Sequence, residues 1–164
     1  GEDVEKQADT VAASLAKKLG GSYRLLNLPD DLGLESAASV REEPRIKQVL
    51  DTIRQASVVV HGVGTAVEMA RRRNLSEAEI AHIQQLGAVG ESFGFYFNSA
   101  GEVVYTTSSL GLRLADLSSV PTVICVGGGA SKSEALSAVL RNGFSHIVVT
   151  DEGAAREIKH ESGR

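Results

Sequence analysis

Apolar residues recur along this chain at two spacings, one typical of amphipathic helices and the other of buried strands. Val11, Leu15 and Leu19, for example, lie four residues apart and share one helical face. By contrast, the run SVVV at 57–60 is typical of a strand buried in a sheet. Over the first half of the chain the pattern predicts a helix ending at Leu19, a strand over Tyr23–Leu28, a helix over Pro44–Arg54, a strand over Ser57–Val60, a helix over Thr65–Arg73, and a helix capped by Ser76 that ends near Gly87.

The second half of the chain interrupts this alternation once. GFYFNSAGEVVY at 94–105 has two strand-like runs around the turn residues Asn98–Gly101, which predicts an antiparallel hairpin. The remainder predicts a strand over Thr122–Val126, a helix from about Ser131, a strand over His146–Thr150 and a helix from Asp151. We therefore expect an α/β fold, a Rossmann-like, doubly wound and mostly parallel sheet with an inserted β-hairpin and with both faces covered.

The start of the chain is unusual for such a fold. A doubly wound domain leads with a strand, whereas GEDVEKQADT opens on a helical pattern. The 164 residues, 42% of them hydrophobic, suit one domain with its own core. We therefore expect residues 1–164 to be a single domain that is N-terminally truncated, with its first strands upstream of Gly1.

Charge and composition narrow the possible functions. The formal net charge is −4, and the basic residues are scattered except at Arg71–Arg73, so we expect no DNA binding by this chain itself. No apolar run approaches the roughly 20 residues that cross a bilayer, and no membrane partner is expected. The single cysteine, Cys125, lies in an apolar run. This placement indicates core packing in a cytoplasmic protein.

The stretch VICVGGGASKSEALSAVL at 123–140 carries the strongest chemical signal. Gly127–Gly129 follow a predicted strand, and Lys132 lies at the start of the next predicted helix. A Walker A loop requires glycine directly before the lysine, whereas Ser131 stands here, and neither this stretch nor HGVGTAV completes a GxGxxG fingerprint. Bare backbone at the end of a strand can still bring amide N–H groups to a phosphate, and it suits a sugar phosphate better than a nucleotide. Alternatively the glycines only permit a tight turn and Lys132 is solvated, and the motif alone leaves both interpretations open.

Three other segments contain residues that could contact a ligand, and a fourth indicates only a helix. His61 ends a strand at a place where open α/β sheets bind ligands, although it is more typical of a packed or hydrogen-bonded residue because no nucleophile accompanies it. The arginines of ARRRN, 70–74, compensate a helix dipole, or one of them turns inward toward a phosphate. Glu91 is either a solvated loop carboxylate or an acceptor for sugar hydroxyls. TDEGAARE, 150–157, predicts an N-capped helix without a ligand role.

Several of these segments together resemble a known family. GEDVEKQADT, VVVHGVG with ARRRN after it, GESFGFYFNSAGEVVY, VGGGASKSEA and VVTDEGAARE occur in this order over essentially the whole chain. The combination resembles the C-terminal effector-binding domain of SorC-type bacterial transcription regulators, and it is specific although each motif alone is weak. The resemblance implies a fold akin to sugar-phosphate isomerases and deaminases, used for sensing and not for turnover. It also implies an N-terminal DNA-binding domain upstream of Gly1.

The resemblance further implies a ligand and its binding residues. For a repressor of glycolytic genes the ligand would be a phosphorylated sugar, fructose 1,6-bisphosphate. Carried over by position, Lys132 and Arg72 would hold a phosphate, and Gln7 and Glu91 would bind sugar hydroxyls or a phosphate edge. The backbone amides of Gly127, Gly128 and Gly129 join this predicted site on the physical ground given above.

The expected partners follow from the same resemblance. They are the sugar-phosphate effector, further copies of the chain in a dimer or tetramer, and operator DNA through the upstream domain alone. No catalytic residue, cofactor or metal is predicted. The alternative is an enzyme of the isomerase or deaminase type, but no Asp/His constellation can be assigned as its general base. A nucleotide-binding Rossmann module is a weaker alternative because both fingerprints fail.

Overall fold

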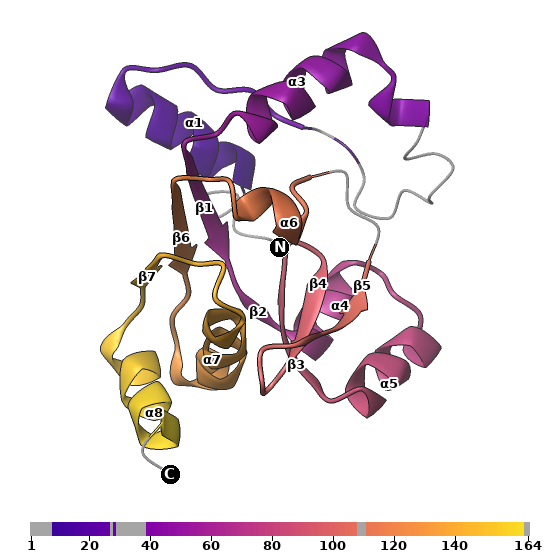
Figure 1. Ribbon diagram of the computed structural model, residues 1–164, viewed down its shortest axis with the longest axis vertical. Helices are drawn as coiled ribbons and strands as arrows, with labels where there is room; N and C mark the ends of the chain where they lie inside the picture. The colour runs from indigo at the N-terminus through magenta and orange to yellow at the C-terminus, as the bar shows by residue number, and fades with distance from the viewer. Residues whose placement is uncertain (1–7, 27, 29–38, 108–110, 163–164) are drawn as a thin grey trace.

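A computed structural model of the chain describes residues 8–26, 28, 39–107 and 111–162 (Figure 1). The helices are α1 (Ala8–Leu19), α3 (Pro44–Arg54), α4 (Ala66–Arg72), α5 (Glu77–Gln85), α6 (Leu114–Leu117), the 3₁₀ turn η2 (Ala130–Lys132), α7 (Ser133–Asn142) and α8 (Glu152–Ser162). The strands are β1 (Val58–Gly62), β2 (Gly64–Thr65), β3 (Ala88–Ser92), β4 (Phe95–Asn98), β5 (Val103–Thr106), β6 (Thr122–Val126) and β7 (Ile147–Val149).

A parallel sheet with the strand order β1-β6-β7 forms one part of the molecule. Val60 of β1 pairs with Ile124 of β6, and Ile124 pairs in turn with Ile147 of β7. The connection from β6 to β7 runs through α7, as expected for parallel neighbours. These strands are the apolar runs of the sequence, so the predicted βαβα tail is confirmed.

One face of this parallel sheet is exposed, which corrects the prediction that both faces are covered. Val58 and Val60 are 51% and 58% exposed, and Val126 and Val149 are 43% and 52% exposed. Cys125, whose side chain points to the other face, is fully buried. Among the described residues, the buried hydrophobic clusters contain the inward side chains of β1 and β6. They contain no side chain from the exposed face, so no cluster covers that face.

The predicted hairpin is part of a larger antiparallel sheet. Four strands pair in the order β2-β3-β4-β5, and the turn between β4 and β5 lies at the predicted NSAG residues 98–101. β2 follows β1 after the single residue Val63, so the chain passes directly from one sheet to the other. The fold is therefore the expected α/β arrangement, with an antiparallel addition that is wider than the predicted ribbon.

Two helices cover the antiparallel sheet. Ser76 caps α5 and exchanges hydrogen bonds with Glu79, so the predicted capping box is present. The buried residues of this layer are Ala66 and Ala70 of α4, Ile80 and Ile83 of α5, and Tyr96 of β4. Figure 1 shows α4 and α5 together beside this sheet, whereas α1 and α3 lie at the opposite end of the molecule.

Helix α7 contacts both sheets. Its buried residues Leu136 and Val139 share one cluster with Cys125 of the parallel sheet and Phe97 of the antiparallel sheet. Gly90 permits this close approach, because an added Cβ there would stand 2.8 Å from the Ala135 carbonyl oxygen. The two sheets are thus held in a fixed relation by one helix.

The predicted strand over Tyr23–Leu28 is wrong for its described residues, which have no strand conformation. A strand exists only when a neighbouring segment completes its hydrogen bonds. The three parallel strands of the described chain pair with one another and not with this segment. The apolar residues of this segment follow a strand-like pattern, but that pattern does not determine a neighbouring strand with which the segment could pair.

Candidate functional site

A cavity of about 400 Å³ lies where the chain passes from the parallel to the antiparallel sheet, a volume within the range of small-molecule pockets. Strand β1, the start of β2, helix α4, the end of β3 and η2 all contribute to its wall. Its lining residues are Val60, His61, Gly62, Val63, Gly64, Glu68, Met69, Arg72, Arg73, Glu91, Ser92, Phe93 and Lys132.

Two cations on this wall are available to an anionic ligand. The Arg72 guanidinium comes from the last turn of α4, and the Lys132 ammonium comes from η2. Within the part of the chain that the structure describes, neither side chain has an ion-pair partner. Arginine provides a planar fork for phosphate oxygens, and lysine provides a point charge.

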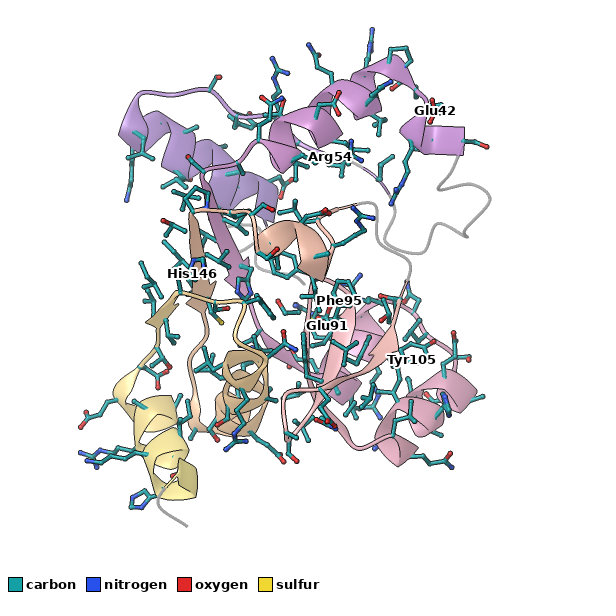
Figure 2. The ribbon with its side chains drawn as sticks, in the orientation of Figure 1. Glu42, Arg54, Glu91, Phe95, Tyr105 and His146 are labelled. Carbon is teal, nitrogen blue, oxygen red and sulfur yellow. The ribbon has the colours of Figure 1, made fainter. Side chains whose placement is uncertain are left out.

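A third cation on the wall, Arg73, is held by a carboxylate. Its Nη2 donates to Oε1 of Glu91 at 3.0 Å, and the two side chains are 15% and 3% exposed. The same Oε1 accepts from the Gly94 backbone N–H at 2.5 Å. Figure 2 shows Glu91 close to Phe95, in the middle of the molecule. Glu91 is therefore a buried, paired carboxylate and not the solvated loop residue that was one of the two alternatives.

Two buried polar atoms beside this pair have no hydrogen-bond partner among the described residues, namely Arg73 Nε and the Tyr96 hydroxyl. Burial raises the pKa of Tyr96 to about 12, and the Glu91 charge adds to this shift. The hydroxyl therefore stays protonated at neutral pH. Both atoms can donate a hydrogen bond, and Arg73 lines the cavity.

His61 is hydrogen-bonded on both ring nitrogens. Nδ1 lies 2.9 Å from Ser92 Oγ, and Nε2 lies 3.0 Å from Ser145 Oγ. Because the Ser92 hydroxyl donates to the Gly62 carbonyl at 2.9 Å, Nδ1 must carry the proton, and Nε2 accepts from Ser145. His61 is thus a packed, hydrogen-bonded residue, in agreement with the expectation from the sequence.

The burial of His61 makes stability depend on pH. Desolvation lowers the pKa of His61 below its ordinary value of 6.5, although the hydrogen bond to Gly62 opposes this shift. Below pH 6.5 the unfolded chain therefore takes up a proton that the folded chain resists, so the free energy of unfolding falls as the pH drops from 6.5 toward the lower folded-state pKa. We expect urea unfolding of wild type and His61→Gln to show a stability difference that shrinks from pH 7.5 to about pH 5.

His160→Gln, at an exposed position on α8, is the matched control for this pH experiment. Because the His160 side chain is exposed, this substitution should change the free energy of unfolding at pH 7.5 by less than His61→Gln does. A constant difference between wild type and His61→Gln would show that His61 titrates alike in the folded and unfolded chain, which would contradict the prediction.

The glycine stretch has partners that its sequence did not reveal. The Gly127 amide donates to the Val149 carbonyl at 3.1 Å, and the Gly129 amide donates to Oδ2 of Asp151 at 2.5 Å. A Cβ on Gly128 would stand 2.5 Å from the same carboxylate oxygen. Hydrogen bonds from the Ala154 and Gly129 amides lower the pKa of Asp151, so this carboxylate stays ionised. Asp151, expected only at the start of a helix without a ligand role, thus caps that helix at the Ala154 amide and also holds the glycine turn.

The predicted site residues are therefore only partly brought together. Arg72, Glu91 and Lys132 line one cavity, although they come from α4, β3 and η2. Gly127, Gly128 and Gly129 are not among its lining residues, and their contact with a phosphate stays a prediction. Gln7 lies outside the described residues.

Several residues that line the cavity were not among the predicted site residues. Glu68 and Met69 of α4 are two of them, and Arg73, Ser92 and Phe93 are three more. The run Arg71–Arg73 left open that one arginine turns inward, but it did not predict that the last two both line the cavity. GESFG at 90–94 contains Ser92 and Phe93, and no signal in that segment distinguished them from strand residues.

Two structural features are absent from the described residues. No group of three or more His, Cys, Asp or Glu side chains there could hold a metal ion. In the same residues, no helix is long and apolar enough to cross a membrane.

Comparison with known proteins gives a consistent result. Residues 1–158 match the family described as "Putative sugar-binding domain". The chain is 46% identical over 158 residues to the central glycolytic genes regulator of Bacillus subtilis, covering 96% of this chain and 46% of that protein. It is 30% identical over 131 residues to the transcriptional regulator LsrR of Escherichia coli K12, covering 74% of this chain and 41% of the relative. The chain thus spans less than half the length of these relatives.

A solved structure agrees in fold. A SorC family transcriptional regulator from Enterococcus faecalis superposes with a TM-score of 0.86 at 41% identity, covering 97% of this chain and 65% of the other. The relatives named here are transcriptional regulators and not enzymes, as the sequence predicted. The chain therefore belongs to the sugar-binding domain family of SorC-type transcriptional regulators.

Proposed function

We propose that this chain is the effector-sensing domain of a cytoplasmic repressor of glycolytic genes, and that its effector is fructose 1,6-bisphosphate. Residues 1–164 would form the ligand-binding domain. Operator DNA would be bound by a separate domain of the complete regulator. Ligand binding would shift the balance between oligomeric arrangements, a dimer or a tetramer, and so change the affinity for the operator.

The observation that carries the proposal is the charge arrangement of the cavity. Arg72 and Lys132 have no carboxylate partner among the described residues, while Glu91 is neutralised by Arg73. Phosphate groups match the two available cations, and hydroxyls match the polar groups that remain, the Glu68 carboxylate among them. The similarity to a central glycolytic genes regulator supports a glycolytic sugar phosphate in particular.

The proposal predicts that Lys132→Ala weakens the binding of fructose 1,6-bisphosphate by about 10- to 100-fold. The physical reason is the loss of one charge-assisted contact of about 1.5–3 kcal/mol. Lys132→Glu should weaken binding further, because it places a like charge beside the phosphate. Calorimetric titration of the full-length regulator measures both effects, and the binding of unphosphorylated fructose should barely change.

Lys17→Ala is the matched control, because Lys17 is an exposed cation on α1. Equal ligand affinities for Lys132→Ala and Lys17→Ala would show that Lys132 is a solvated charge and would contradict the proposed site. The sensing function has its own test in operator binding followed by fluorescence anisotropy. An operator affinity that does not change when fructose 1,6-bisphosphate is added would contradict the regulatory part of the proposal.

A further inference from the structure

The turn between β3 and β4 has an unusual backbone. Ser92 pairs with Phe95, and the two residues between them have positive φ angles, 57° at Phe93 and 85° at Gly94. This is the conformation of a type I′ hairpin turn, which normally selects Asn-Gly because a side chain at the first position is crowded by its own backbone. Phenylalanine is a poor choice for this turn on local grounds alone.

Surrounding contacts hold Phe93 in this conformation. The Gly94 amide is bound by the buried carboxylate of Glu91, and Ser92 is bound to His61. The Phe93 ring lies over the His61 ring with centroids 4.8 Å apart, and it meets Phe144 edge-on at 6.1 Å. A residue in a sparsely populated conformation persists only when its neighbours fix it, and such residues cluster at functional sites.

The strained residue contributes directly to the cavity. Phe93 is half-buried and lines the same cavity as Arg72 and Lys132. His61, which contacts the Phe93 ring, also lines that cavity, and so do Glu91 and Ser92, which bond to Gly94 and to His61. The wall therefore combines cations that can hold a phosphate with an aromatic side chain that can pack against apolar groups.

We propose that Phe93 is a ligand-binding residue that packs against the C–H surface of the bound sugar. This inference rests on the proposed function. A sugar ring or chain presents apolar C–H groups between its hydroxyls, and an aromatic ring buries such groups at a small entropic cost. The cations recognise the phosphate, and Phe93 recognises the carbon skeleton that carries it. The contact is apolar, so salt does not screen it.

Phe93→Asn tests the proposal, because asparagine suits the first position of a type I′ turn and removes the ring. We expect the full-length variant to unfold within about 5 °C of the parent protein. Its affinity for fructose 1,6-bisphosphate should fall at least about tenfold, by the same factor at about 50 mM and about 500 mM salt. Phe93→Tyr, which keeps the ring, should bind within about threefold of the parent.

The possible outcomes separate this inference from the proposed function. Equal binding by Phe93→Asn and the parent would overturn the role of Phe93 alone, and so would a loss of affinity that disappears at high salt. A parent protein that binds no sugar phosphate would overturn the proposed function and the role of Phe93 with it. If Phe93→Asn does not fold, Phe93→Leu replaces it. Binding by Phe93→Leu as tight as by Phe93→Tyr would then overturn the inference.

Discussion

Replacing Arg73 by methionine is expected to lower the free energy of unfolding by about 3–5 kcal/mol. The Arg73–Glu91 pair is nearly buried, with side chains 15% and 3% exposed and a bond of 3.0 Å. Methionine fills much of the arginine volume, so most of the loss comes from a buried Glu91 carboxylate that keeps, among the described residues, only the Gly94 amide as a hydrogen-bond partner. Urea unfolding at neutral pH, followed by circular dichroism, measures the effect.

Arg156→Met is the matched control, since Arg156 pairs with Glu152 at 2.6 Å but both side chains are more than 70% exposed, at 72% and 78%. This exposed pair should contribute less than about 1 kcal/mol. The double variant Arg73→Met/Glu91→Gln should recover part of the lost stability, because it removes the unpaired charge. Equal losses for Arg73→Met and Arg156→Met would contradict the importance given to the buried pair.

Replacing Gly101 by alanine is expected to cost about 2–5 kcal/mol of stability. Gly101 has a φ of +84°, and a Cβ there would stand 2.7 Å from the Asn142 backbone nitrogen. The contact is fixed from both sides, because Arg141 donates to the Ser99 carbonyl at 2.7 Å and Asn142 donates to the Gly101 carbonyl at 2.8 Å. The hairpin turn therefore cannot move away from the end of α7 without breaking these bonds.

Gly143→Ala separates the two causes of that loss. Gly143 has nearly the same backbone angle, +88°, but no atom lies within 4 Å of its hypothetical Cβ. Its substitution should cost only the backbone strain, about 1–2 kcal/mol. Thermal and urea unfolding of the two variants give the difference directly. Equal losses of stability in the two variants would mean that the close contact between the hairpin turn and α7 adds nothing to the cost at Gly101, contrary to the structure.

Both predictions concern contacts that hold the elements around the candidate site in place. The Arg73–Glu91 pair joins α4 to the end of β3, and the Gly101 contact joins the antiparallel sheet to α7. Lys132 immediately precedes α7, and Phe93 follows β3 directly. A ligand that contacts Lys132 and Phe93 would therefore touch elements whose relative positions these two contacts maintain.

The sequence by itself determined the elements whose signals are local. Ser76 and Glu79 are three residues apart, so their capping box can be recognised without knowledge of the fold, and Pro44 marks the start of α3 in the same way. Local signals also predicted the turn at residues 98–101 and the alternation of strands and helices after Thr122. Three candidate site residues, Arg72, Glu91 and Lys132, came from the family resemblance and lie together in the cavity.

The tertiary structure alone decided which groups meet across the chain. His61 bonds to Ser145, 84 positions away, and the Gly129 amide bonds to Asp151, 22 positions away. No local pattern encodes these pairs, because a polar group accepts many partners and the fold selects among them. For the same reason the apolar pattern of Tyr23–Leu28 did not suffice for a strand, and the described residues of this segment form none. Hydrogen bonding between segments and burial depend on neighbours that periodicity does not specify.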